Sequence, residues 1–294
     1  MNTFESITQA IQTLVKAAGP AVVTLGGHPR GGSGFVVAPG RVLTNAHNTR
    51  GDDLAVRFAD GREARARRLG TDVDGDLAVL EVDTGEIAPL EWAGAPPELG
   101  QAVFAVTNAP GAGTRVTIGT VSGVNRTFRG PRGRRIGGTI EHTAPLAPGS
   151  SGSPILDTSG KVLGINTNRL GDGFYLAIPA GEALLRRVEG LARGETVETP
   201  RLGVSLLPSR VARRLRHAVG LPEREGLLIS DVEDGSPAEA AGLREGDLIV
   251  TAGGDPVATF DDLSAALGRA DKGGVLAVRV LRGADEVDVS VTLG

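Results

Sequence analysis

The sequence predicts a mainly β protein of about two domains, with an all-β barrel or sandwich first and a smaller α+β domain after it. Its 294 residues are enough for two hydrophobic cores. Glycine, at 44 residues, favours tight turns between short strands over long helices. After Pro20, short apolar runs such as GFVVAPG, RVLTNAH and DLAVLEVD alternate with Gly, Pro and Asp, which is the rhythm of an all-β domain.

Residues 1–19 depart from this β pattern. Apolar side chains recur at helical spacing from Phe4 to Ala18, and Gly19-Pro20 ends the run, which predicts a surface helix packed on the body of the protein. The segment does not resemble a signal peptide, because Lys16 is its only cation and polar residues interrupt it. No apolar run approaches the roughly 20 residues that cross a bilayer. A cytoplasmic location fits these features, and so does export of a chain whose leader has been removed.

The β pattern continues to about Ile178-Pro179, and a helix is expected over residues 180–192. Residues 195–200 are polar and end in Pro, which is typical of a linker. From residue 201 onwards, strand-like and helix-like segments alternate, for example GLLISDV, SPAEAAGL and DLIVTAGG. The helical segment SRVARRLRHAVG is basic, and its Arg213, Arg214 and Arg216 are expected on the solvated face of that helix. The predicted organisation is a helix at 1–19, a first domain at 20–194, a linker at 195–200 and a second domain at 201–294.

Composition excludes several classes of function. The net charge is −4 and basic residues are mixed with acidic ones, so no nucleic-acid partner is expected. The chain has no Cys, which excludes disulfides, thiolate metal sites and a Cys nucleophile. His28, His142 and His217 have no metal-ligand spacing. We expect neither a metal nor another cofactor.

Three short segments carry residues suited to nucleophilic catalysis: TNAH at 44–47, GDLAVL at 75–80 and PGSSGSP at 148–154. A serine hydroxyl needs a base to take its proton, and a histidine base needs a carboxylate to fix its tautomer. We therefore assign Ser151 as nucleophile, His47 as general base and acid, and Asp76 as the orienting carboxylate. The backbone N–H groups of Gly149 and Ser151 are expected to form the oxyanion hole.

Neighbouring residues are weaker candidates for the same roles. Asp72 and Asp74 lie in the preceding turn, where Asp is common for structural reasons, whereas Asp76 adjoins the apolar strand. Ser150 and Ser153 do not occupy the turn position of the nucleophile motif. The chain order His, Asp, Ser is that of the chymotrypsin arrangement, which agrees with the all-β prediction.

These segments resemble those of the HtrA (Deg) serine proteases. TNAH resembles the family's block around its catalytic His, DLAVL the block around its Asp, and TAPLAPGSSGSPILDTSGKVLGINTN the block around its nucleophile. The resemblance covers nearly the whole chain after Pro20. It implies a chymotrypsin-like double six-stranded β-barrel followed by one PDZ domain, and a serine-type endopeptidase acting through an acyl-enzyme.

The chain departs from the family pattern at three places. Asn48 stands where the family usually has Val, Ser150 where it has Asn, and Ser153 where it has Gly. Ser153 also resembles the glutamyl endopeptidases, a related barrel family. None of these changes removes a catalytic group, so they bear on substrate preference and rate rather than on reaction class.

The resemblance also implies partners. HtrA substrates are unfolded or damaged proteins, and a PDZ domain receives C-terminal peptides as an added strand. Arg201-Leu202-Gly203-Val204 resembles the family's carboxylate-binding loop, so Leu202, Gly203 and Val204 are expected to bind the peptide carboxylate. The helix at 259–270 would form the second wall of the groove. We expect a homotrimer, with the N-terminal helix as a candidate interface.

Three points stay open at the level of sequence. The arginines at 126–135 form either a solvated loop or, by resemblance, a regulatory loop near the active site; they are Arg126, Arg129, Arg132, Arg134 and Arg135. No acidic residue lies just before the nucleophile, at Ala144 to Leu146, which favours cleavage after medium aliphatic residues. The alternative function is a peptide-binding, chaperone-like protein with minor proteolysis; a non-specific esterase would leave the PDZ domain without a purpose.

Overall fold

The computed structural model describes residues 2–26, 31–49, 54–109, 113–129, 135–171, 173–196, 200–270 and 273–294. The chain forms two compact units that divide near residue 198. Of the predicted linker, residues 197–199 lie outside the described residues. No helix in the described ranges is long and apolar enough to cross a membrane.

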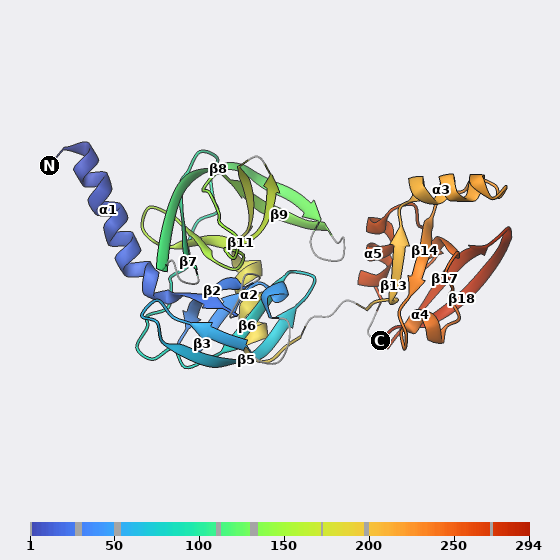
Figure 1. The fold of residues 1–294 in the computed structure, drawn as a ribbon, viewed down its shortest axis with the longest axis horizontal. Coiled ribbons are helices and arrows are strands. Elements are labelled where there is room, and N and C mark those ends of the chain that lie inside the picture. Colours follow the sequence, from blue (N-terminus) through green and yellow to red (C-terminus); the bar gives the residue numbers. More distant parts are fainter. Residues whose placement is uncertain are drawn as a thin grey trace. The chain divides into compact units, whose positions relative to one another are not determined.

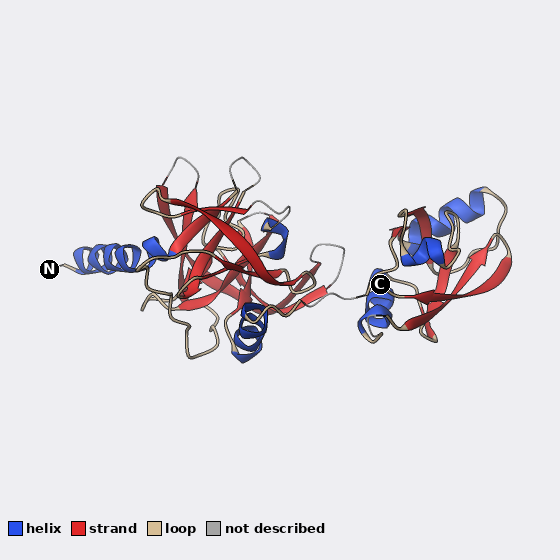
Figure 2. Ribbon diagram, turned by 90° about the horizontal axis from the view of Figure 1, so that it is seen from below, coloured by secondary structure: helices blue, strands red, loops and turns tan. Residues whose placement is uncertain are grey.

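The first unit contains two closed six-stranded antiparallel barrels (Figures 1 and 2). This confirms the mainly β fold class. The first barrel has the strand order β1-β2-β3-β6-β5-β4 and consists of β1 (Val22–Leu25), β2 (Gly32–Ala38), β3 (Arg41–Thr44), β4 (Leu54–Arg57), β5 (Glu63–Asp72) and β6 (Leu77–Glu81). The second has the order β10-β11-β12-β9-β8-β7 and consists of β7 (Ala102–Ala109), β8 (Gly113–Arg129), β9 (Arg135–His142), β10 (Pro154–Leu156), β11 (Val162–Gly171) and β12 (Phe174–Pro179).

One hydrophobic cluster is shared by the two barrels, and the second barrel has a further cluster of its own. All four residues of β1 are buried. This strand pairs with its neighbours in the first barrel and also lies against β7 of the second barrel. Phe35 and Leu43 of the first barrel belong to the same cluster as Val106 and Ile165 of the second. This shared core holds loops from both barrels at one place, where the candidate active site lies.

Helix α1 (Thr3–Ala18) is packed on the barrels only in its C-terminal half. Leu14 and Ala18 are buried, whereas Phe4 is 81% exposed and Ile7 51% exposed, and Figure 1 shows the N-terminal half extending away from the barrels. The helix itself is as predicted, and the 3₁₀ turn η1 (Gly19–Ala21) follows it. The predicted surface helix packs on the body only along its C-terminal half, where Leu14 and Ala18 join the core, because the apolar stripe is longer than the surface that it contacts.

Helix α2 (Glu182–Ala192) closes the first unit against β5 and β6. Its Leu184, Val188 and Leu191 are buried in the shared core. Gly70 of β5 lets the helix approach, since a Cβ there would lie 2.5 Å from the Leu191 carbonyl oxygen and 2.3 Å from that of Glu195.

The second unit is a six-stranded sheet with three helices and its own core. The order is β13-β14-β15-β17-β18, with β16 paired to β15. The strands are β13 (Val204–Leu207), β14 (Leu227–Val232), β15 (Leu248–Ala252), β16 (Asp255–Pro256), β17 (Val275–Arg282) and β18 (Asp285–Thr292); the helices are α3 (Ser209–Ala218), α4 (Pro237–Ala240) and α5 (Phe260–Gly268). β13 is an edge strand, which leaves its outer backbone groups available for pairing.

One prediction for α3 is corrected by the structure. Arg213, Arg214 and Arg216 were expected together on the wet face of this helix, but Arg216 is only 3% exposed. Its guanidinium donates to the carbonyl oxygens of Pro222 and Gly283, each at 3.1 Å. Burial lowers the pKa of Arg216, and the nearby Arg224 adds to this effect.

Candidate active site

Asp76 lies at the end of the turn between β5 and β6 in a strained backbone conformation. Its φ is +54°, in the left-handed region that favours glycine. Asn45 holds this conformation, because its Nδ2 donates to the Asp76 carbonyl oxygen at 2.9 Å. The side chain is only 1% exposed, so its carboxylate is directed into the protein rather than into water.

His47 lies on the 3₁₀ turn η2 (Ala46–Asn48), which directly follows β3. Its Nδ1 is 2.8 Å from Asp76 Oδ2, and its backbone N–H donates to Asp76 Oδ1 at 3.1 Å. Because a carboxylate can only accept, Nδ1 carries the proton and Nε2 of the neutral ring carries the lone pair. This is the tautomer that a general base requires.

The side chain of Thr167, on β11, is the other partner of this carboxylate. Its hydroxyl donates to Asp76 Oδ2 at 2.8 Å and is buried. The sequence analysis assigned Thr167 no role, although it lies in the GINTN segment that resembles the HtrA family. The family-like GINTN segment could therefore have pointed to Thr167, but only the fold brings Thr167 into contact with Asp76.

Ser151 lies in the turn that precedes β10, between two glycines with left-handed backbones. Gly149 has φ +87° and Gly152 has φ +89°. A Cβ at Gly152 would lie 2.1 Å from the Ser33 carbonyl oxygen, so only glycine fits there. The Ser151 hydroxyl donates to the Thr167 carbonyl oxygen at 3.3 Å, and no hydrogen bond joins it to His47 among the described residues.

The predicted oxyanion donors lie on this turn. In the described part of the chain, the backbone N–H groups of Gly149 and Ser151 have no hydrogen-bond acceptor, whereas those of Ser150 and Gly152 donate to Ala147 and Asn166. Two unpaired N–H groups next to a serine hydroxyl are the donors that a developing oxyanion needs.

The other candidates from the sequence are engaged elsewhere. Asp72 is buried, accepts from the Gly75 N–H at 2.8 Å and forms an ion pair with Arg187 of α2. Asp74 lies in the turn between β5 and β6. The Ser153 hydroxyl is buried and accepts from Asn166 Nδ2 at 2.9 Å, and Ser150 is 4% exposed.

A pocket of about 240 Å³ opens beside Ser151. Its walls are the nucleophile turn, β11 and β12, and none of the described residues lining it is acidic or basic: Leu146, Ala147, Pro148, Gly149, Ser150, Ser151, Asn166, Thr167 and Tyr175. Such a pocket suits an uncharged side chain of moderate size.

A buried histidine lies behind two residues of this pocket. His142 stacks on Tyr175, with ring centroids 5.8 Å apart, and its Nε2 is 2.8 Å from Asn166 Oδ1. Its Nδ1 is buried and has no partner among the described residues. Burial lowers the pKa of His142 to about 4, and the hydrogen bond with Asn166 opposes only part of this shift.

The predicted peptide-carboxylate loop lies at the start of β13. Leu202 is buried and Gly203 has φ +79°, and in the described ranges neither backbone N–H has an acceptor. Leu202 and Val204 share an apolar cluster with Phe260 and Leu263 of α5. The edge strand, the free N–H groups and the helix are the parts of a groove that adds a peptide as a further strand.

Two further regions can be placed with respect to the site. Of the five arginines at 126–135, only the side chain of Arg126 is described, and it lies 3.4 Å from Glu141. The other four side chains lie outside the described residues.

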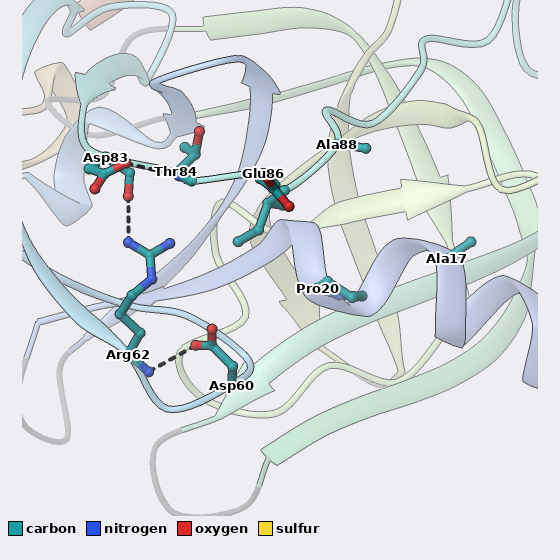
Figure 3. Close-up of a pocket in the computed structure, with 10 residues that line it drawn as sticks. Ala17, Pro20, Asp60, Arg62, Asp83, Thr84, Glu86 and Ala88 are labelled. Atoms are coloured by element: carbon teal, nitrogen blue, oxygen red, sulfur yellow. Dashed lines mark hydrogen bonds between the residues drawn. The ribbon is translucent and has the colours of Figure 1, made fainter.

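A separate open hollow of about 670 Å³ lies beside α1. Its Arg62 donates to the Asp83 carbonyl oxygen and to Asp60 (Figure 3), and none of the candidate catalytic residues lines it.

Comparison with known proteins follows the two units. A family model for a trypsin-like peptidase domain matches residues 32–165, and one for a PDZ domain matches residues 200–293. Curated relatives include the serine protease Do-like HtrA of Bacillus subtilis (32% identity, 86% of this chain and 60% of the relative). Others are the chloroplastic Protease Do-like 1 of Arabidopsis thaliana (34%, 90% and 64%) and HhoA of Synechocystis (33%, 88% and 69%). The chain spans 55% to 69% of the length of such relatives.

Solved structures match over nearly the whole chain. The HtrA-type protease AlgW, solved with a decapeptide, has a TM-score of 0.65 at 27% identity and covers 96% of this chain and 98% of its own. A serine endoprotease from Yersinia pestis has a TM-score of 0.62 at 26% identity and covers 96% of each chain.

Proposed function

Because the chain belongs to the HtrA family of serine proteases, we propose that it hydrolyses internal peptide bonds of unfolded or damaged proteins. The observation that carries this proposal is the buried Asp76 carboxylate 2.8 Å from His47 Nδ1, beside a serine turn with two N–H groups that have no acceptor among the described residues. We assign residues 20–194 to the protease domain and 201–294 to the PDZ domain.

The reaction begins when substrate displaces the Ser151 hydroxyl from Thr167 and the serine turns towards His47. His47 Nε2 accepts the hydroxyl proton as Oγ attacks the scissile carbonyl carbon, and Asp76 stabilises the imidazolium. The N–H groups of Gly149 and Ser151 bind the oxyanion. His47 then gives its proton to the leaving amine, and water hydrolyses the acyl-enzyme by the same route. No cofactor takes part in these steps.

The pocket beside Ser151 selects the residue before the cleaved bond. Leu146 and Tyr175 are in its walls, and its volume is about 240 Å³. We propose a preference for medium aliphatic side chains there. A peptide library with dominant cleavage after basic or acidic residues would be incompatible with this uncharged lining.

The second unit recruits or senses substrate. We propose that Leu202, Gly203 and Val204 bind the carboxylate of a C-terminal peptide, which pairs with β13 as an added strand. The HtrA-type neighbour AlgW was solved with a decapeptide, which supports a peptide ligand.

We also propose a homotrimer in which the exposed Phe4 and Ile7 of α1 contact another copy. Relatives named as periplasmic or chloroplastic support export.

Digestion of unfolded casein by wild type and by Ser151→Ala tests the central proposal. We expect cleavage by wild type, abolished in Ser151→Ala, and stimulation of wild type by a peptide with a free C-terminus. An amidated copy of the peptide is the matched control. Casein left intact by both proteins, together with protection of an unfolded client from aggregation, would instead favour a peptide-binding chaperone.

A further inference from the structure

Asn48 follows His47 on η2, and its side chain reaches the nucleophile turn. Its Nδ2 lies 2.9 Å from the Ser151 carbonyl oxygen and 3.1 Å from Thr44 Oγ1. We propose that Asn48 is a positioning residue that fixes the nucleophile Ser151 relative to the base His47. This inference rests on the proposed function and adds a residue to its machinery.

The orientation of the Asn48 amide is determined by its partners. The Ser151 carbonyl oxygen can only accept a hydrogen bond. The Thr44 hydroxyl donates to the Ser33 carbonyl oxygen at 2.6 Å, so it too acts as an acceptor towards Asn48. A flipped amide would place its oxygen against two acceptors, which makes the NH₂ group the one that faces Ser151.

These bonds close into a ring. The Ser33 N–H donates to the Ser151 carbonyl oxygen at 2.8 Å, so the ring runs from Ser33 to Ser151, to Asn48, to Thr44 and back to Ser33. Three of its members come from the first barrel and one from the turn before β10. Both lone pairs of the Ser151 carbonyl are occupied, and the linked hydrogen bonds of this part-buried ring polarise and so reinforce one another.

Glycines on two sides leave room for this ring. A Cβ at Gly32 would lie 2.1 Å from Asn48 Cγ and 2.2 Å from Nδ2. A Cβ at Gly152 would lie 2.7 Å from Thr44 Oγ1 and 3.0 Å from Asn48 Nδ2. Real Cβ atoms essentially never lie closer than 3.0 Å to such neighbours, so a Cβ at position 32 would displace the Asn48 amide, and one at position 152 would press on Thr44 Oγ1 and crowd the amide.

The ring connects the base to the nucleophile by a short path. His47 and Asn48 are adjacent on η2, so the same short turn positions the imidazole and the amide that contacts the Ser151 carbonyl. Reacting atoms must be held about 3–3.5 Å apart, and a misplacement of about 1 Å can cost about 10²-fold in rate. The pocket beside Ser151 does not include Asn48, so its removal should lower kcat more than it raises KM.

The test compares Asn48→Leu, which keeps the branched shape without the N–H donor, with wild type on one peptide substrate. We expect kcat to fall between about tenfold and about 10²-fold and KM to stay within about twofold. Thr24→Val is the matched control, since Thr24 Oγ1 donates to the Asn108 carbonyl oxygen at 2.8 Å and also joins the two barrels. It should lower the melting temperature and leave kcat unchanged.

Gly32→Ala provides a second, independent test. By displacing the Asn48 amide, it should reproduce the loss of kcat. In an Asn48→Ala background it should lower kcat no further, because the new methyl group then fills the vacated space. Full kcat in Asn48→Leu, or an equal loss in Thr24→Val, would overturn the inference while an active wild type upholds the proposed function. A wild type without activity in the casein digestion would overturn both.

Discussion

Acidification should destabilise the first unit through one buried histidine. Burial lowers the pKa of His142 to about 4 in the folded protein, whereas the unfolded chain titrates near the ordinary value of about 6.5. Between these two values the unfolded state binds more protons than the folded state. The contribution to stability is therefore complete above about pH 6.5 and is lost progressively as the pH falls towards 4.

The size of the effect follows from the two pKa values. One unit of pKa difference corresponds to about 1.4 kcal/mol, so the free energy of unfolding should fall by about 2 kcal/mol at pH 5 and by about 3 kcal/mol at pH 4, relative to neutral pH. Replacing His142 by Gln removes the titrating group and keeps an amide that can donate to Asn166 Oδ1. The variant should therefore lose less stability on acidification than wild type.

Trp92 provides the signal for this measurement. It is the only Trp in the chain, and its ring packs on Phe35 of the first barrel with centroids 5.9 Å apart, so its fluorescence reports on the first unit. Denaturant unfolding at about pH 7.5 and about pH 5 should show about 2 kcal/mol more loss in wild type than in His142→Gln. His217→Gln, at an exposed position, should behave like wild type. Equal losses in wild type and His142→Gln would refute the reasoning.

Three further predictions concern the triad, the barrel and the PDZ unit. Thr167→Val removes the hydroxyl that donates to Asp76 at 2.8 Å; steady-state kinetics should show kcat about tenfold lower, and an unchanged kcat would contradict the role given to Thr167. Gly70→Ala brings a methyl group to 2.5 Å from the Leu191 carbonyl oxygen, so unfolding should show a loss of about 1–3 kcal/mol, whereas Gly94→Ala, with open space around it, should leave stability unchanged. Gly203→Ala combines a φ of +79° with a Cβ 2.3 Å from that of Ser236; fluorescence anisotropy should show at least about tenfold weaker binding of a C-terminal peptide, and wild-type affinity would argue against the loop.

Short-range pattern was sufficient for the architecture. The alternation of apolar runs with turn residues predicted the β-rich first unit, and the mixed pattern after residue 201 predicted the α+β second unit. Local motifs were likewise sufficient to propose His47, Asp76 and Ser151, because each lies in a short segment whose adjacent residues form part of the same motif: TNAH, GDLAVL or PGSSGSP. These properties depend on residues a few positions apart, which a sequence displays directly.

The sequence was less informative where burial depends on distant partners. Helical spacing identified α1 but not the exposure of Phe4, because the local sequence carries no information on how much barrel surface the helix can contact. A run of arginines predicted a wet helix face, yet Arg216 is buried because the carbonyl oxygens of Pro222 and Gly283 lie within its reach. Whether a polar side chain can be buried depends on such partners.

By itself, then, the sequence determined the fold class, the two-unit organisation and the residue types available for catalysis. Only the tertiary structure decided that Thr167 contacts Asp76 across 91 positions and that Asn48 holds Ser151 across 103. The physical reason is that both contacts join separate barrels. A hydrogen bond requires atoms within about 3 Å and a favourable angle, and the packing of the shared core, rather than any local motif, brings these atoms together.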